Sequence, residues 1–344
     1  MRRLSMAVGC DIGTCWIVSA RQGDDSQIQV KSIRDAYFRT ENDGGSGIKS
    51  MLEMSSVSFI EDNEDLYIIG DNSLVLANLF HREVCRPMQQ GVLAPGDKNA
   101  EKILLLLLDN ILGKAKVKDE LCCFSVPAAP TDGNIDIVYH EAIFKKLIGS
   151  LGYRAEPLNE ASAIAFSNAA KEQFSAIAIS CGSGMVNVCL MYKTFVSLSY
   201  SIQGAGDWID FNASKSVGTT SARLQKIKEM GVDLMNPAAG DPKYLREREA
   251  IVIYFKALIL RILDSLKSQF IEKQSTIELP ESIPIIIAGG TSKAKNFLEF
   301  FISIFNSLKE KFPIPVSEIR MASGDPLQSV AQGLLVVALN KEAK

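Results

Sequence analysis

Apolar and polar positions alternate along this chain with two different periods. Short runs of β-branched and apolar residues that end at turn formers predict buried strands at 57–60, 66–69, 121–126 and 283–288. Longer stretches in which apolar residues return every three or four positions predict helices, at 98–112, 136–151, 161–170, 221–231, 245–270, 296–311 and 325–339. Because strands and helices alternate, the pattern predicts the α/β class.

Two segments share one further pattern. Residues 6–20 and 176–190 each predict a strand, a glycine-containing turn and a second strand. When the two segments are aligned, Asp11-Ile12-Gly13-Thr14-Cys15 falls opposite Ser180-Cys181-Gly182-Ser183-Gly184. The match indicates an internal repeat with one hairpin at the head of each half, and chance agreement between two ordinary glycine hairpins is the alternative.

Composition and charge narrow the classes of protein. The 344 residues are enough for two domains, and 47% apolar with 22% charged residues is ordinary for a globular protein. The formal net charge of −3 provides no basic field for nucleic acid or an anionic membrane. Asp11 interrupts the apolar stretch that follows Arg2-Arg3, and the aliphatic run 103–108 is far too short to span a bilayer. We therefore expect a soluble, cytoplasmic protein that binds no nucleic acid.

The cysteines and histidines limit the chemistry further. The seven cysteines, an odd number, show no C-x-x-C spacing, and the chain has only two histidines. We therefore expect small buried thiols in a reducing cytosol rather than disulfides or a zinc site. Two histidines make a catalytic mechanism or a metal site built on histidine unfavoured.

Four glycine-rich turns are candidates for binding a phosphorylated ligand. In the first, Gly13 permits a left-handed backbone and close approach of a ligand, Thr14 offers a hydroxyl donor, and Asp11 can hold the water shell of Mg²⁺. The other three turns follow predicted strands, and their candidate residues are Gly182, Ser183 and Gly184; Gly206 and Asp207; and Gly289, Gly290, Thr291 and Lys293. Taken singly, each turn is better interpreted as an ordinary one.

Taken in order along the chain, these turns resemble a known set of motifs. The superfamily of actin, sugar kinases and heat-shock ATPases has a first phosphate loop, a connecting helix that opens with Glu-Pro, a second phosphate loop, an adenosine motif and a final connecting helix. Here the matching segments are 11–14, Glu156-Pro157 leading into 161–165, 180–187, 288–293 and 325–333. On these motifs the chain is identified as a member of this superfamily, over about residues 6–340.

The stretch 67–71, the step Arg86-Pro87-Met88 and the pair Gly91-Val92 resemble bacterial actins of the MreB and MamK type. The resemblance implies a two-lobed actin-like ATPase fold of duplicated ribonuclease-H-like domains, each with a five-stranded mixed sheet, and a nucleotide cleft between the lobes. Lobe I is expected over 1–155, with a small insert at about 40–95 and the C-terminal helix 325–344 returning to it. Lobe II is expected over 156–324, with an insert at about 212–245 that turn formers such as Pro237 shorten.

The resemblance also implies roles for individual residues. ATP or ADP with Mg²⁺ would bind to the hairpin turns, with Asp11 reaching the metal through water and Glu156 orienting the attacking water. The cofactor-binding roles fall to the turns and to two residues of the helix at 221–231; these residues are Gly13, Thr14, Gly182, Ser183, Gly184, Gly206, Asp207, Lys228, Glu229, Gly289, Gly290, Thr291 and Lys293. The alternative for Glu156 is a carboxylate that stabilises a helix N-terminus.

Two departures from the family pattern bear on activity. Ser180 stands where the second phosphate loop normally has an aspartate, and Asn187 stands at a position that is often acidic. We therefore expect a weak ATPase at most. The favoured function is a cytoskeletal or scaffold filament protein that self-associates or binds a protein partner, and the alternative is a non-polymerising nucleotide-dependent switch. For Leu79-Phe80, a membrane contact is less favoured than packing against lobe I.

Overall fold

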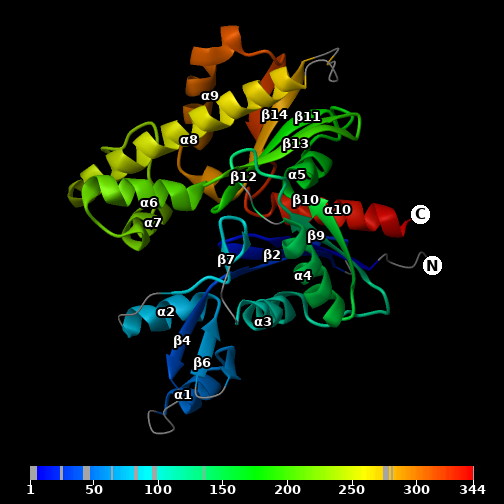
Figure 1. Cartoon of the computed structure of the whole chain (residues 1–344), viewed down its shortest axis with the longest axis vertical. Helices are drawn as coiled ribbons and strands as arrows, with labels where there is room; N and C mark the ends of the chain where they lie inside the picture. Colours follow the sequence, from blue (N-terminus) through cyan, green and yellow to red (C-terminus); the bar gives the residue numbers. More distant parts are fainter. Residues whose placement is uncertain are drawn as a thin grey trace. The chain divides into compact units, whose positions relative to one another are not determined.

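In the computed structural model, the chain divides into two compact units. Unit 1 comprises Met1–Val126, Asp136–Leu158 and Leu334–Lys344, and unit 2 comprises Pro127–Ile135 and Asn159–Gly333. The structure describes residues 6–343 except 24–25, 42–46, 63–64, 81–83, 95–98, 134, 136, 274–278 and 280–281. Each unit is built on one five-stranded sheet, whose strands are labelled in Figure 1.

The sheet of unit 1 has the strand order β10-β9-β1-β2-β3. β1 pairs antiparallel with β2 and parallel with β9, and β2 pairs antiparallel with β3. The central strands β1 and β9 consist almost entirely of buried residues, as expected for strands that are covered on both faces. The strands span Ala7–Ile12 (β1), Trp16–Gln22 (β2), Ile28–Arg34 (β3), Leu121–Val126 (β9) and Arg154–Asn159 (β10).

Helices and sheet share one apolar core in unit 1. The leucine-rich run of α3 forms much of it, and Leu104, Leu107 and Leu108 are fully buried there. Apolar positions that recur every three to four residues place these side chains on the face that packs against the sheet. The helices are α3 (Ala100–Leu112), α4 (Ile137–Ser150) and the C-terminal part of α10 (Ser329–Glu342). Within the described residues, no helix has both the length and the apolar character needed to cross a membrane.

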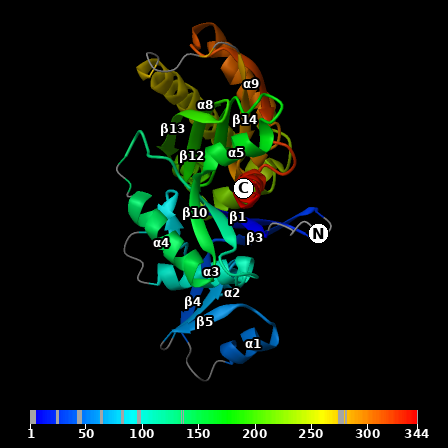
Figure 2. The ribbon, with the colours of Figure 1, turned by 90° about the vertical axis from the view of Figure 1, so that its right-hand side faces the viewer.

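A smaller subdomain, which we call the insert, interrupts unit 1 between β3 and β7. Its three-stranded sheet has the order β4-β6-β5, and Figure 2 shows β4, β5 and α1 together at one end of the unit. A core of its own holds the insert together, with Phe38, Leu66 and Ile68 fully buried. The elements are β4 (Tyr37–Glu41), α1 (Ile48–Met54), β5 (Phe59–Asp62), β6 (Asp65–Ile69) and α2 (Asp71–Leu79), followed by β7 (Met88–Gln89) and β8 (Val92–Leu93).

The sheet of unit 2 has the order β13-β12-β11-β14-β15. β11 pairs antiparallel with β12 and parallel with β14, and β12 pairs antiparallel with β13. This is the same succession of pairs as β3-β2-β1-β9 in unit 1, so the internal repeat predicted from the two hairpins is confirmed. The strands span Ala176–Cys181 (β11), Met185–Tyr192 (β12), Phe195–Gln203 (β13), Ile283–Ala288 (β14) and Val316–Met321 (β15).

Unit 2 has a second apolar core. Its longest helix, α8 (Leu245–Glu272), packs into this core with the buried residues of one helix face. The stretch 212–245, where a shortened insert is expected, is described throughout and contains helices but no strand. The other elements are α5 (Glu160–Asn168), α6 (Gly206–Val217), α7 (Ser221–Glu229), α9 (Phe297–Leu308) and the 3₁₀ turns η1 (Pro242–Tyr244), η2 (Gly290–Lys293) and η3 (Lys309–Lys311).

All seven cysteines lie in the described part of the chain, and none forms a disulfide. Cys85 is exposed, so the expectation of buried thiols is wrong at that position. It is confirmed for the six others, Cys10, Cys15, Cys122, Cys123, Cys181 and Cys189.

A buried ion pair joins β2 to the start of β9 in unit 1. Arg21 Nη1 lies 2.6 Å from Glu120 Oε1, and the Glu120 side chain is fully buried. The second guanidinium nitrogen of Arg21 donates to the Leu112 carbonyl oxygen at 3.0 Å and also to the Tyr153 hydroxyl. Glu120 Oε2 accepts from the backbone N–H of Lys116 at 2.7 Å, so both carboxylate oxygens have partners.

We expect Glu120→Gln to destabilise unit 1, because it leaves Arg21 without its counter-charge in a buried site. Breaking a buried pair by removing one partner costs about 3–5 kcal/mol, whereas an exposed pair contributes about 1 kcal/mol or less. The control is Asp62→Asn, which breaks the more exposed pair with Lys102. Urea unfolding measures both variants. Equal losses of unfolding free energy would show that the buried Arg21–Glu120 pair stabilises the protein no more than the exposed pair does.

Candidate functional site

Hairpins β1–β2 and β11–β12 close with the same turn. Gly13 N–H donates to the Trp16 carbonyl oxygen at 2.9 Å, and Gly182 N–H donates to that of Met185 at 3.0 Å. A Cβ atom at position 13 would lie 3.0 Å from the Trp16 oxygen, and one at position 182 would lie 2.9 Å from the Met185 oxygen. Close approach therefore favours glycine at both turns. The expected left-handed backbone at Gly13 is wrong, because its φ lies outside that region.

Backbone N–H groups at both turns are available to an anion. Among the described residues, the N–H groups of Thr14, Ser183 and Gly184 find no protein acceptor. Successive N–H groups in a turn form a concave site that binds phosphate-like anions. The residues present therefore fit a phosphate group at each hairpin. The Thr14 hydroxyl oxygen accepts from the Gly91 N–H at 3.0 Å, which ties this turn to the segment that precedes β8.

Asp11 lies near the end of β1, beside the first turn. Ile12 N–H donates to Ser125 Oγ at 2.7 Å, which ties β1 to β9. Burial raises the pKa of Asp11 from 3.8 to about 7, and a hydrogen bond with Ser125 opposes the shift. A nearby cation favours the ionised form of such a carboxyl. The carboxyl is therefore suited to a hydrated divalent cation.

The second turn is held by the start of α6. Three successive carbonyl oxygens, those of Gly182, Ser183 and Gly184, each accept from a backbone N–H of that segment. The donors are Gly206 at 3.2 Å, Asp207 at 2.9 Å and Gly204 at 2.9 Å respectively. These bonds fix the turn against the helix N-terminus, and the predicted residues Gly206 and Asp207 are thereby brought to the predicted Gly182–Gly184 turn.

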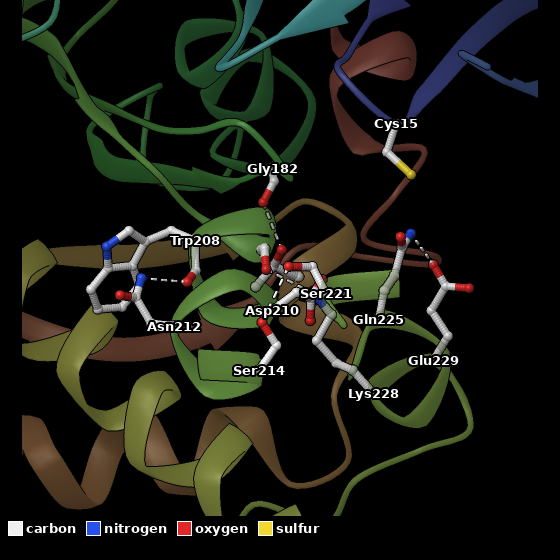
Figure 3. A network of polar contacts seen from close by, with 12 residues as sticks. Cys15, Gly182, Trp208, Asp210, Asn212, Ser214, Ser221, Gln225, Lys228 and Glu229 are labelled. Carbon is white, nitrogen blue, oxygen red and sulfur yellow. Dashed lines mark hydrogen bonds and ion pairs between the residues drawn. The ribbon is translucent and has the colours of Figure 1, made fainter. Parts of the chain in front are cut away.

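Two more predicted residues join this group, as Figure 3 shows in part. Lys228 Nζ lies 3.0 Å from the Gly206 carbonyl oxygen and 2.6 Å from Asp210 Oδ2. Thr291 Oγ1 donates to the Gly182 carbonyl oxygen at 2.6 Å. The Asp210 side chain is only 4% exposed, so it fixes the Lys228 ammonium in a nearly dry site. Sequence reasoning missed Asp210, although its spacing of three from Asp207 on a helix could have indicated a shared face.

Gly289 follows β14 directly and contacts the end of β11. Its φ is 97°, and a Cβ atom there would lie 2.4 Å from the Cys181 carbonyl oxygen, so only glycine fits. Lys293 Nζ lies 3.0 Å from Asp325 Oδ2 in a partly exposed ion pair, and its place beside a nucleotide stays a prediction. Glu229 accepts from Gln225 Nε2 at 2.9 Å on the surface of α7.

Glu156 does not open a helix. It lies within β10, where Lys341 Nζ reaches its Oε2 at 2.5 Å. This hydrogen bond lowers the pKa of Glu156, and Arg154 adds to the effect. The connecting helix begins four residues later, so the expected Glu-Pro helix start is corrected. Pro157 lies in the strand, which leaves Glu156 facing α10 rather than a turn.

Glu160 is the carboxylate that the fold brings to the second hairpin. It occupies the first turn of α5, which Asn159 caps by accepting from the Ser162 N–H at 3.1 Å. Glu160 Oε2 accepts from Asn187 Nδ2 at 3.0 Å and from Ser180 Oγ at 3.3 Å. The fully buried Asn187 also accepts from the Ala128 N–H at 2.8 Å through its Oδ1. The two positions that depart from the family pattern are therefore donors to Glu160.

Leu79 and Phe80 lie at the end of α2. Leu79 is 65% exposed, whereas Phe80 is 38% exposed and its ring stacks on that of Phe38 with centroids 5.8 Å apart. Phe80 thus packs partly on the insert. Membrane contact at this pair stays a prediction.

The fold matches solved structures of actin-like proteins over nearly its whole length. Structural similarity is found to the MamK double helical filament (15% identity, TM-score 0.68, covering 97% of this chain and 98% of MamK). MreB5 of Spiroplasma citri bound to AMPPNP matches with 14% identity and a TM-score of 0.63, covering 99% of this chain and 98% of MreB5. The ethanolamine utilization protein EutJ from Carboxydothermus hydrogenoformans matches with 13% identity and a TM-score of 0.54, covering 96% of this chain and 89% of EutJ.

The chain therefore has the fold of the actin-like ATPases, of the MreB and MamK type, as its motifs predict. No curated protein sequence matches it. A family model described as Volactin matches residues 6–338.

Asp11→Asn tests the raised pKa of this carboxyl in the nucleotide-free protein. Between pH 3.8 and about 7 the folded protein retains a proton that the unfolded chain has released, so the stabilisation from that proton is lost as the pH rises through this window. Asparagine has no such proton to lose. We expect Asp11→Asn to raise the thermal midpoint at about pH 8 and to leave it nearly unchanged near pH 4. Scanning calorimetry measures both, with the exposed Asp109→Asn as control, and a gain of equal size at both pH values would contradict the assignment.

Proposed function

Since the chain belongs to the Volactin family and has an actin-like ATPase fold, we propose that it is an ATP-binding cytoskeletal or scaffold protein that assembles into filaments and hydrolyses ATP slowly. The observation that carries this proposal is the pair of equivalent hairpins, each closed by a glycine turn that presents N–H groups for which the described residues offer no acceptor. Each turn by itself suits one phosphate group.

The choice of ATP draws support from proteins of the same fold. MreB5 of Spiroplasma citri has been solved bound to AMPPNP and to ADP, and a non-polymerising MamK mutant bound to AMPPNP. In this chain the N–H groups of Thr14, Ser183 and Gly184 would hold phosphate oxygens. Asp11 would accept hydrogen bonds from the water shell of Mg²⁺, which supplies positive charge to the phosphates when bound. Gly289 and Gly290 would border the base, and Lys228 would approach the nucleotide from α7.

Glu160, rather than Glu156, is proposed to orient the attacking water. Its carboxylate lies beside the second turn and is held by Ser180 and Asn187, whereas that of Glu156 is held by Lys341 on another element. A carboxylate that accepts two hydrogen bonds is fixed in direction and retains lone pairs for a water molecule. Slow turnover is expected because Ser180 and Asn187 provide neutral dipoles where further carboxylates would organise the metal.

Filament assembly is the favoured function and a switch is the second. The similarity to the MamK double helical filament supports self-association. The strand-free stretch 212–245 favours the alternative, a non-polymerising protein that changes partners with nucleotide state, because strands there would have enlarged the surface offered to a neighbouring copy.

Calorimetry with ATP and Mg²⁺ tests the nucleotide assignment. We expect binding with a dissociation constant below about 1 mM, which corresponds to about −4 kcal/mol or tighter. ATP-dependent pelleting followed by electron microscopy then separates the two functions, since filaments are expected for the first and soluble protein for the second. The absence of both binding heat and a thermal shift at millimolar ATP would refute the nucleotide-binding proposal.

Glu160→Gln and Glu156→Gln form a matched pair for the catalytic assignment. Loss of a group that orients or deprotonates water typically costs about 10²-fold or more, so we expect Glu160→Gln to lower ATP turnover by about that factor. Glu156→Gln removes partly exposed pairs with Lys341 and Arg154 and should leave turnover within about twofold. Phosphate release measures both. The reverse ranking would return the role to Glu156.

A further inference from the structure

The insert joins the main sheet of unit 1 through two chain crossings. The first is Asp35–Ala36, directly after β3, and the second is Cys85–Pro87, directly before β7. Tyr37 and Cys85 pair the two crossings, with N–H to carbonyl oxygen distances of 2.8 and 2.9 Å. The Gly70 N–H also donates to the Ala36 carbonyl oxygen at 2.9 Å. The two crossings are therefore bonded to each other and form one narrow neck.

The turn of hairpin β1–β2 contacts both sides of this neck. Asp35 N–H donates to the Cys15 carbonyl oxygen at 3.0 Å on the first crossing. Gly91 N–H, just beyond the second crossing, donates to Thr14 Oγ1 at 3.0 Å. Because Thr14 and Cys15 are consecutive, a displacement of the turn passes directly to the two strands that carry the insert.

The side chain of Asp35 is buried in this neck without a hydrogen-bond donor among the described residues. It is 0% exposed, and within the described part of the chain neither carboxylate oxygen accepts a hydrogen bond. Burial raises the pKa of Asp35 well above its usual value, and the charge of Arg86 on the second crossing opposes the shift. A buried carboxyl without donors is unfavourable, so the neck gains free energy from any state that brings a donor to it.

We propose that Asp35 is a positioning residue, which pairs with the Arg86 guanidinium when ATP is bound at the first hairpin and so locks the insert to the phosphate-binding turn. This Asp35–Arg86 latch rests on the proposed function. A phosphate held by the Thr14 N–H moves the turn, and the bonds to Asp35 and Gly91 carry that movement to both crossings. ATP binding and latch closure then favour each other, as linkage requires.

Calorimetric titration with ATP and Mg²⁺ tests the latch on Asp35→Ala, and Asp71→Ala is the control. Asp71 also belongs to the insert but is 66% exposed and lies 3.5 Å from Arg34 Nε. We expect Asp35→Ala to weaken ATP binding about tenfold, within the range of couplings between sites, and Asp71→Ala to leave it unchanged. In the nucleotide-free protein, Asp35→Ala is expected to raise the thermal midpoint, because the unsatisfied carboxyl is gone. A merely structural residue would lower the midpoint.

Arg86→Gln and the double variant complete the test. If the two side chains act as one pair, Asp35→Ala combined with Arg86→Gln weakens ATP binding no more than Asp35→Ala alone. Additive losses, or an ATP affinity that Asp35→Ala leaves unchanged, would overturn the latch while the nucleotide assignment stands. If the unaltered protein binds no ATP, the proposed function fails, and the latch fails with it.

Discussion

The carbonyl oxygen of Gly182 is the point on which the site of unit 2 is assembled. It accepts from the Gly206 N–H at 3.2 Å and from Thr291 Oγ1 at 2.6 Å, so the starts of α6 and η2 meet at the turn after β11. Such convergence leaves no room for side chains. A Cβ atom at position 206 would lie 2.6 Å from Thr291 Oγ1, and one at position 289 would lie 2.4 Å from the Cys181 carbonyl oxygen.

These glycines come from separate parts of the sequence, yet one constraint requires them. With side chains excluded and the carbonyl oxygens engaged, the groups left at the turn are backbone donors, which is the chemistry that an anion needs. Unit 1 reaches a similar turn by other means. There the Ser125 hydroxyl oxygen accepts from the Ile12 N–H and the Thr14 hydroxyl oxygen accepts from the Gly91 N–H, and the carboxyl of Asp11 adds a group that can ionise. The duplicated topology therefore supports two turns with different electrostatics.

Strands with continuous apolar runs were the most predictable elements. β9 and β14 begin and end where the pattern 121–126 and 283–288 places them, because both are buried on both faces. The edge strand β3 was missed, since the apolar alternation that begins at Ile28 is broken at Ser32 and most of the strand is exposed. α6 was interpreted as a turn only, because its glycine start and its Asp, Asn and Ser content favour turns unless tertiary packing overrides them.

The site was predictable in its turns but not in its side-chain partners. The glycine turns could be found because close approach constrains residue type locally. The pairing of Lys293 with Asp325 could not be predicted, because the two residues are 32 positions apart. The predicted start of the connecting helix was wrong for a local reason. Glu156-Pro157 matches the Glu-Pro pair that opens this helix in the superfamily, but here the pair lies in β10. Asn159 followed by Glu160 is a helix-capping signal that could have corrected it.

The neutral residues beside Glu160 have a consequence of their own. Three carboxylates at positions 160, 180 and 187 would repel one another at these distances unless a cation stood between them. With Ser180 and Asn187 as donors, Glu160 Oε2 instead accepts two hydrogen bonds, at 3.3 and 3.0 Å. These two bonds orient the carboxylate from within the protein. The same exchange lowers the negative charge that could anchor a metal shell, which agrees with the slow turnover proposed above.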